Sequence, residues 1–149
     1  MAEKLYPSFD IPIQDSIAVD DESTREFKPA PYFDFDKGDF VTDGMNRVVY
    51  ADGKEAFKQW IQKMLYTPYL SCLAYMGCGI ELDEAMHCTT RAETESTLST
   101  SITETLMKHP CTERVYDFQF GWRGDQLFMR FTVQPKAWPA FDVSRTIVA

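Results

Sequence analysis

The feature that most constrains this chain is one amphipathic segment, Gly53 to Thr67, with the sequence GKEAFKQWIQKMLYT. Its apolar residues recur with a period near 3.6, and its charged and amide residues occupy the opposite face, which predicts a helix. Pro68 is expected to end it, because the residue before a proline disfavours the helical conformation. Such a helix is marginal alone, so we expect another element to cover its apolar stripe. The stripe consists of Ala56, Phe57, Trp60, Ile61, Met64 and Leu65.

The last third of the chain predicts the surface that this helix needs. Two stretches of strict alternation flank the turn Arg123-Gly124-Asp125, as in a β-hairpin. Phe141 to Val148 is expected to add a final strand at the edge. The alternating sets are Tyr116, Phe118, Phe120 and Trp122 before the turn, and Leu127, Met129, Phe131 and Val133 after it.

Between these elements the chain carries shorter signals. Two short strands are expected within Tyr32 to Val41 and Arg47 to Tyr50, and a strand or buried extended piece within Tyr69 to Gly79. One or two helical turns are expected within Glu81 to His87. Thr90 and Glu93 have the spacing of a capping box, which predicts a helix from about Arg91 to Lys108 with Leu98, Ile102, Thr105 and Leu106 on one side.

These signals together predict an α+β fold. We expect a small antiparallel or mixed sheet with two or three helices packed on one face. Residues 31–149 are expected to form this domain, and residues 1–30 an extended arm, since prolines interrupt any periodic pattern there. Tyr6 and Phe9 are aromatic anchors suited to a neighbour's groove; a tail without fixed structure is the alternative.

Composition excludes several classes of function. The 149 residues carry a formal net charge of −8 without a basic cluster, so we expect no nucleic-acid partner. The longest uncharged run, Met64 to Ile80, contains polar residues and glycines and is too short for a membrane span. The amino terminus lacks the pattern of a signal peptide, so we expect a soluble, cytosolic chain.

No pattern of catalytic, metal or cofactor residues emerges. The cysteines and histidines lack the paired spacing of zinc sites, so Cys72, Cys78, Cys88 and Cys111 are expected to be buried free thiols. The acids Glu81, Asp83 and Glu84 suit the first turn of a helix better than a hydrolase pair. Gly77-Cys78-Gly79 is not a phosphate loop, because the third glycine and a following Lys-Ser or Lys-Thr are missing.

The order of several motifs resembles the baseplate wedge family of contractile phage tails. This family includes the W protein, the lysozyme-like wedge subunit, and relatives in defective prophages and tail-like bacteriocins. The resemblance covers about residues 31–135. It is carried by Tyr32-Phe-Asp-Phe-Asp-x-Gly-Asp-Phe40, Glu55-Ala-Phe-Lys-Gln-Trp-Ile61, Leu65-Tyr-Thr67, Tyr75-x-x-x-Gly79-x-Glu-Leu82 and the closing hairpin.

The resemblance implies a structural virion component rather than an enzyme. It implies a place in the tail baseplate, assembled in the host bacterial cytoplasm, with other wedge subunits, the central hub or spike, and the tail sheath as partners. The family's Glu-Pro-Arg motif corresponds here to Glu113 and Arg114, and only Arg114 matches cleanly. Sheath contact by strand addition would use the edge strand that carries Phe141 and Val143.

Two other functions remain open from the residues. One is a small peptidoglycan hydrolase, and the other is a cytosolic protein-binding adaptor. Arg114 also has two readings, since its guanidinium either pairs with a local acid or reaches a partner.

Overall fold

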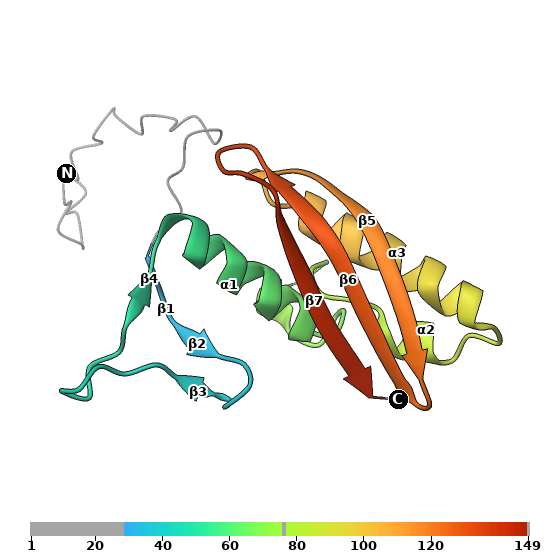
Figure 1. Cartoon of the computed structure of the whole chain (residues 1–149), viewed down its shortest axis with the longest axis horizontal. Coiled ribbons are helices and arrows are strands. Elements are labelled where there is room, and N and C mark those ends of the chain that lie inside the picture. The colour runs from blue at the N-terminus through green and yellow to red at the C-terminus, as the bar shows by residue number, and fades with distance from the viewer. Residues whose placement is uncertain (1–28, 76, 149) are drawn as a thin grey trace, which may run out of the picture.

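A computed structural model describes residues 29–75 and 77–148. It confirms the α+β class: an antiparallel sheet of order β5-β6-β7 has helices α1 and α3 on one face (Figure 1). The larger elements are α1 (Gly53–Tyr66), α3 (Arg91–Met107), β5 (Thr112–Arg123), β6 (Gln126–Pro135) and β7 (Phe141–Val148). The shorter ones are β1 (Ala30–Pro31), β2 (Phe33–Asp34), β3 (Asp39–Phe40), β4 (Tyr50–Ala51), η2 (Leu73–Tyr75) and α2 (Leu82–Met86).

Helix α1 forms where the periodicity predicts it. Thr67, immediately before Pro68, has an extended backbone and ends the helix. Most of the apolar stripe is buried, and Phe57 and Ile61 are fully inaccessible. Trp60 is only partly buried, stacked 6.1 Å from the Phe57 ring. Helix and sheet share one core, which supplies the burial that the isolated helix lacks.

Helix α3 begins at the predicted capping box. The Glu93 amide donates to the Thr90 hydroxyl at 3.2 Å, and the Thr90 amide donates to the Glu93 carboxylate at 3.2 Å. The predicted inner side is confirmed, since Leu98, Ile102, Thr105 and Leu106 are all buried.

Buried hydroxyls of α3 also hold the segment that precedes it. Thr94 donates to the Ala85 carbonyl at 3.0 Å, and Thr105 donates to the Gly79 carbonyl at 2.5 Å. The Ser101 hydroxyl accepts from the Glu81 amide at 2.9 Å. Serine and threonine are weak helix formers, but here they satisfy backbone groups that the core would otherwise leave unpaired.

One part of the predicted hairpin pattern is wrong. The register of β5 against β6 shifts between Tyr116 and Gln119, and Asp117 has a φ of 59°. This bulge reverses the alternation on its amino-terminal side. Val115 therefore takes the inner position, and Tyr116 is 37% exposed. Phe118, Phe120 and Trp122 pack against the core as predicted.

The segment before α2 also differs from its prediction. The described residues between Tyr69 and Gly79 form no strand: they contain the short η2 helix, Leu73 is 87% exposed, and the backbone is buried only at Gly79. Its base is closed where the Tyr69 amide donates to the Ile80 carbonyl and the Ile80 amide donates to the Thr67 carbonyl, each at 3.0 Å. Backbone hydrogen bonds at its base, rather than buried side chains, thus hold this loop in place.

Near the start of the domain, the structure has four two-residue strands in place of the two that the sequence predicts, arranged as two small antiparallel pairs. β1 lies outside the predicted stretches, and its first residue, Ala30, falls in the predicted arm. β1 pairs with β4, and β2 pairs with β3. They form a projection beside α1 (Figure 1). Tyr6 and Phe9 of the predicted arm lie outside the described residues. No helix among the described residues is both long and apolar enough to cross a membrane.

Candidate partner interface

Strand β7 is the sheet edge that the sequence predicts as a partner surface. Among the strands that the structure describes, β7 pairs only with β6, from Phe141 opposite Val133 to Val148 opposite Gln126. Every second backbone amide and carbonyl of an edge strand points away from its one neighbour. β7 therefore presents a row of peptide groups that can accept a further strand.

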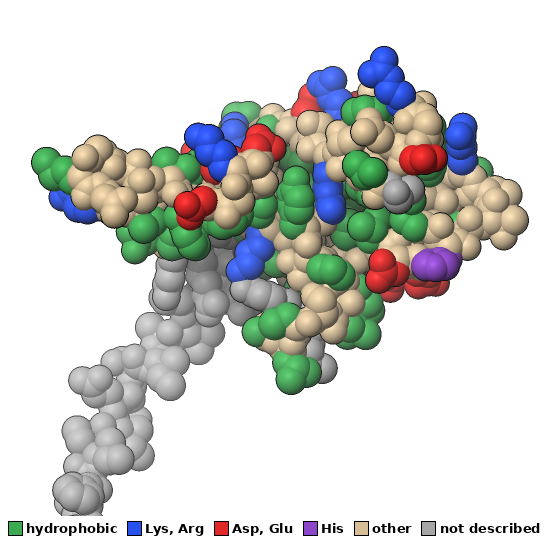
Figure 2. Space-filling model, turned by 90° about the horizontal axis from the view of Figure 1, so that it is seen from below, with side chains coloured by type: hydrophobic (Ala, Val, Ile, Leu, Met, Phe, Trp, Pro, Cys, Tyr) green, Lys and Arg blue, Asp and Glu red, His purple; other side chains and the backbone are tan. Residues whose placement is uncertain are grey.

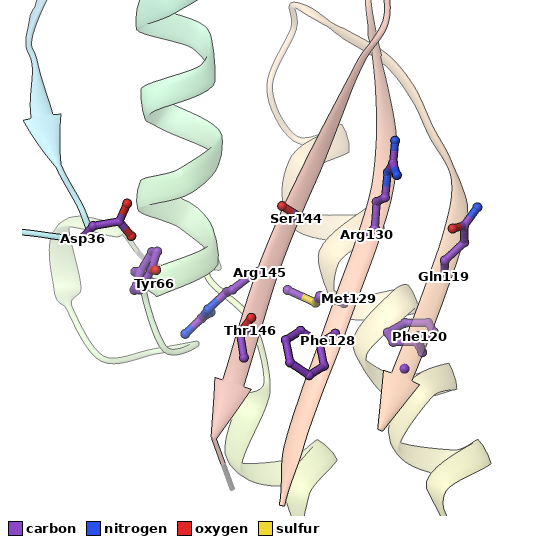
Figure 3. A pocket seen from close by; sticks show the side chains of 11 residues that line it. Asp36, Tyr66, Gln119, Phe120, Phe128, Met129, Arg130, Ser144, Arg145 and Thr146 are labelled. Carbon is purple, nitrogen blue, oxygen red and sulfur yellow. The ribbon is translucent and has the colours of Figure 1, made fainter. Parts of the chain in front are cut away.

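Two hollows meet at this edge, and Figure 3 shows the side chains that line the first of them. One, of about 570 Å³, spreads over the outer face of the sheet, where Phe128 and Arg130 lie. The other, of about 470 Å³, lies between the Tyr32 to Asp36 segment, α1 and β7. Both are lined by Asp36, Tyr66, Ser144 and Arg145. The edge of β7 thus faces open space with a wall opposite.

That opposite wall is largely aromatic. The Phe33 and Phe35 rings lie 5.0 Å apart, and Phe35 stacks on Tyr66 at 5.1 Å. The amide of Phe33 donates to the Gln59 side chain of α1 at 3.2 Å, which ties the wall to the helix. A partner segment entering here meets aromatic rings together with Asp34 and Asp36 on one side, and a strand edge on the other.

Arg145 is the cation of this edge. It is half-buried on the inner face of β7, between Val143 and Ile147. Its guanidinium donates to the carbonyl oxygen of Leu65 and lies 4.4 Å from the Tyr66 ring centre. Burial lowers the pKa of its guanidinium, and the Tyr66 hydroxyl offsets part of that effect. Sequence reasoning missed Arg145, and its only signal was a cation in the inner series of an alternating strand.

Phe141 and Val143, proposed as partner residues from the sequence, lie on the inner face of β7. Val143 is only 8% exposed, within the core. Phe141 packs 6.2 Å from Phe57, and the ammonium groups of Lys54 and Lys58 each lie 5.5 Å from its ring centre. Contact at these two positions would therefore involve mainly the backbone.

Glu113 and Arg114 are exposed at the start of β5, on the strand farthest from β7. The Arg114 guanidinium lies 4.7 Å from the Tyr116 ring centre. No ion pair joins it to a carboxylate of the described residues. The bulge that turns Tyr116 outward provides this ring. The structure thus separates the Arg114 region from the β7 edge.

Exposed apolar side chains gather at two projecting segments. One is the region of β3 and β4, where Met45 is 76% exposed and Tyr50 is 64% exposed. Figure 2 shows hydrophobic side chains at the tip of this projection. The other is the loop after α1, where Leu70 is 64% exposed. Leu70 also has a φ of 57°, which costs energy for a branched side chain.

Residues that could carry chemistry are dispersed. Within residues 29–75 and 77–148, no group of three or more His, Cys, Asp or Glu side chains could hold a metal ion. The prediction that all four cysteines are buried is wrong, since Cys72 is exposed and the other three are partly accessible. Burial raises the pKa of the Cys111 thiol despite the nearby Lys136, which keeps the thiol in its less reactive form.

Comparison with known proteins decides the family. The model of a family described as the contractile injection system sheath initiator matches residues 31–136, well over half of the chain. The chain belongs to the sheath initiator family. No curated protein matches it. The match ends after β6, so β7 and Arg145 lie outside it.

Membership in the sheath initiator family confirms the coarser part of the sequence resemblance. The chain has a structural role in a contractile injection system, among the components of its sheath and baseplate. Assignment to the wedge or W protein family in particular stays a prediction.

Proposed function

We propose that this chain is a structural subunit of the inner baseplate wedge of a contractile phage tail or a tail-derived particle. In this role it contacts other wedge subunits and the central hub, and the first ring of sheath subunits starts on it. The particle is assembled in the cytoplasm of the host bacterium. The observation that carries the proposal is the outer edge of β7, which pairs with no other strand of the described residues and lies along a hollow, in a chain of the sheath initiator family.

The sheath contact follows from the chemistry of the edge. Strand addition satisfies the outward peptide groups of β7 through main-chain hydrogen bonds. The adjoining hollow of about 470 Å³ leaves space beside the strand. The exposed apolar projections, including Met45 and Leu70, supply separate surfaces for the other baseplate contacts. A subunit of this design joins neighbours and performs no catalysis.

Co-expression with the neighbouring baseplate and tail sheath genes tests the proposal. The expected result is a stable complex with the sheath subunit in size-exclusion chromatography with mass detection. Elution of the chain alone, together with clearing of bacterial cell walls by the purified protein, would replace the proposal with the hydrolase alternative. A variant lacking residues 1–28 shows whether that segment contributes to the complex.

Residue-resolved hydrogen exchange tests the mode of contact. In the free chain, alternate amides of β7 are protected by β6 and the others exchange fast. Binding of the sheath subunit by strand addition should protect the fast set and leave the slow set unchanged. Protection confined to Arg114 and the start of β5 would place the sheath contact on the other side of the sheet.

A further inference from the structure

We propose that the sheath strand received by β7 carries an acidic residue that pairs with Arg145, flanked two positions away on each side by apolar residues. This inference rests on the proposed function and adds the chemistry by which the partner strand is recognised. It is carried by Arg145, which forms no ion pair with a carboxylate of the described residues, and by the two hollows that Arg145 lines. Figure 3 shows Arg145 on β7.

Arg145 has more hydrogen-bonding capacity than its present contacts use. A guanidinium carries five N–H donors, and the described contacts are the Leu65 carbonyl and the Tyr66 ring. Its Nε is buried and has no hydrogen-bond partner among the described residues. No carboxylate of the described residues forms an ion pair with it. A partly buried cation without a carboxylate favours the arrival of one.

The neighbouring arginine of the sheet shows the contrast. Arg130, on β6, donates to Asp142 of β7 across the outer face, and the Thr132 hydroxyl donates to the same carboxylate at 2.8 Å. This cation already has its acid. Arg145 lies one strand farther out, where no strand of the described residues supplies a cross-strand neighbour on the open side. The missing position is the one that an added strand would occupy.

The geometry of a sheet places a partner residue within reach of Arg145. An added strand lies about 4.8 Å from β7, and directly opposed side chains have Cβ atoms roughly 5 Å apart. A residue opposite Arg145 therefore enters the space before its guanidinium. Residues two positions away lie opposite Val143 and Ile147, whose own side chains are buried in the core on the same face of the sheet. The strand is thus expected to read apolar-x-acid-x-apolar in either direction.

Asp36 is the acid of this chain that lines both hollows with Arg145. Figure 3 shows its carboxylate beside Tyr66, on the wall across from β7. Asp34, on the same wall, is 3.6 Å from the Lys37 ammonium, and backbone donors lower the pKa of its carboxyl. If Asp36 were the true partner of Arg145, removal of either side chain would destabilise the free chain, and the two effects would be coupled.

Peptide binding to the full chain tests the inference. The probes are overlapping synthetic peptides that cover the tail sheath subunit encoded in the same gene cluster, each also made with every Asp and Glu changed to its amide. The expected result is that bound peptides contain the apolar-x-acid-x-apolar pattern. Changing the acid to its amide should weaken binding by about ten-fold, as expected for one charged hydrogen bond.

Variants of the chain identify Arg145 as the group that recognises the acid. Arg145→Gln should bind the acidic and amide peptides equally, while Arg145→Lys should retain most of the preference. Arg123→Gln, which removes the same charge from the exposed β5–β6 turn, should keep the preference unchanged. Thermal unfolding of each variant separates loss of binding from loss of fold.

Three results would overturn the inference. The first is sheath peptides that bind with no dependence on their acids, which leaves the proposed function intact. The second is coupling of Asp36→Asn with Arg145→Gln in the stability of the free chain. The third is absence of any bound sheath peptide. If the sheath subunit also failed to co-elute in the co-expression experiment, the proposed function would fall as well.

Discussion

The indole N–H of Trp122, on β5, donates to the carboxylate of Glu95, on α3, at 2.8 Å. The guanidinium of Arg91, one turn earlier on the helix, lies 5.0 Å from the centre of the same indole. These contacts attach the amino-terminal half of α3 to the turn end of β5. The contacts lie at the edge of the core, where the side chains of Trp122 and Glu95 are only partly buried.

Removing the carboxylate should loosen this attachment. Glu95→Ala is expected to lower the free energy of unfolding by about 1 kcal/mol, since a partly exposed hydrogen bond to a charged acceptor contributes at the lower end of its range. Glu95→Gln should cost less, because the amide oxygen still accepts. Urea denaturation followed by tryptophan fluorescence measures both. An equal loss in a Trp122→Phe background would show that the two groups do not interact.

Gly79 occupies a position that no other residue fits. Its φ is 110°, and a Cβ there would lie 2.6 Å from the Thr67 carbonyl oxygen. Gly79→Ala should therefore destabilise the domain by at least about 2 kcal/mol, because both strain and overlap oppose it. Gly38→Ala is the control: its φ is 72°, but nothing lies within 4 Å, so a cost of about 1 kcal/mol is expected. Similar losses at both glycines would contradict the close approach.

Alanine substitutions at two phenylalanines of β6 compare the stability contributed by a core side chain with that contributed by a surface side chain. Phe131 is fully buried, whereas Phe128 is 40% exposed on the outer face of the sheet. Phe131→Ala should cost about 3–5 kcal/mol through lost burial and the cavity left behind, and Phe128→Ala less than about 1.5 kcal/mol. Chemical denaturation of the two variants gives the comparison. A larger loss at Phe128 would mean that the outer face is covered in solution.

His109 should make stability depend on pH near neutrality. Burial lowers the pKa of its imidazole below the usual 6.5, and the Trp60 ring centre lies 4.5 Å away. Because the unfolded chain binds the proton more tightly than the folded chain, protonation favours unfolding. Stability should therefore be full above pH 6.5 and fall as the pH drops through 6.5 toward the lower folded value.

Denaturation at a series of pH values, with His109→Phe for comparison, measures this dependence. For the wild type, the slope of the free energy of unfolding against pH, between about pH 7.5 and 5.5, should correspond to a fraction of one proton taken up on unfolding. That slope should be smaller in the variant. A slope unchanged by the substitution would assign the titration to other groups.

Local signals in the sequence were sufficient for the helices. The period of the Phe57 stripe, the break at Pro68 and the reciprocal capping of Thr90 and Glu93 depend on neighbours within a few residues. The positions of these helices can therefore be predicted without the rest of the chain. The strands β6 and β7 could also be predicted from the sequence, since uninterrupted alternation assigns each residue to a face of the sheet.

The sequence alone did not reveal features that depend on distant partners. The bulge at Asp117 turns Tyr116 outward, although the residues around it alternate regularly. The loop from Tyr69 to Gly79 looks apolar enough for a buried strand, yet backbone bonds to Ile80 close it at the surface. In both cases pairing across the chain overrides local preference.

The sequence by itself determined the α+β class, the bounds of the main helices and the strand at the sheet edge, because periodicity and capping act over a few residues. Only the tertiary structure decided that Arg145 is partly buried without an ion pair to any carboxylate of the described residues. Arg145 reads as one arginine among many, and its burial beside Leu65 and Tyr66 arises when residues 80 positions apart meet. The free energy of an unpaired charge depends on its surroundings in space, and these exist only once the chain has folded.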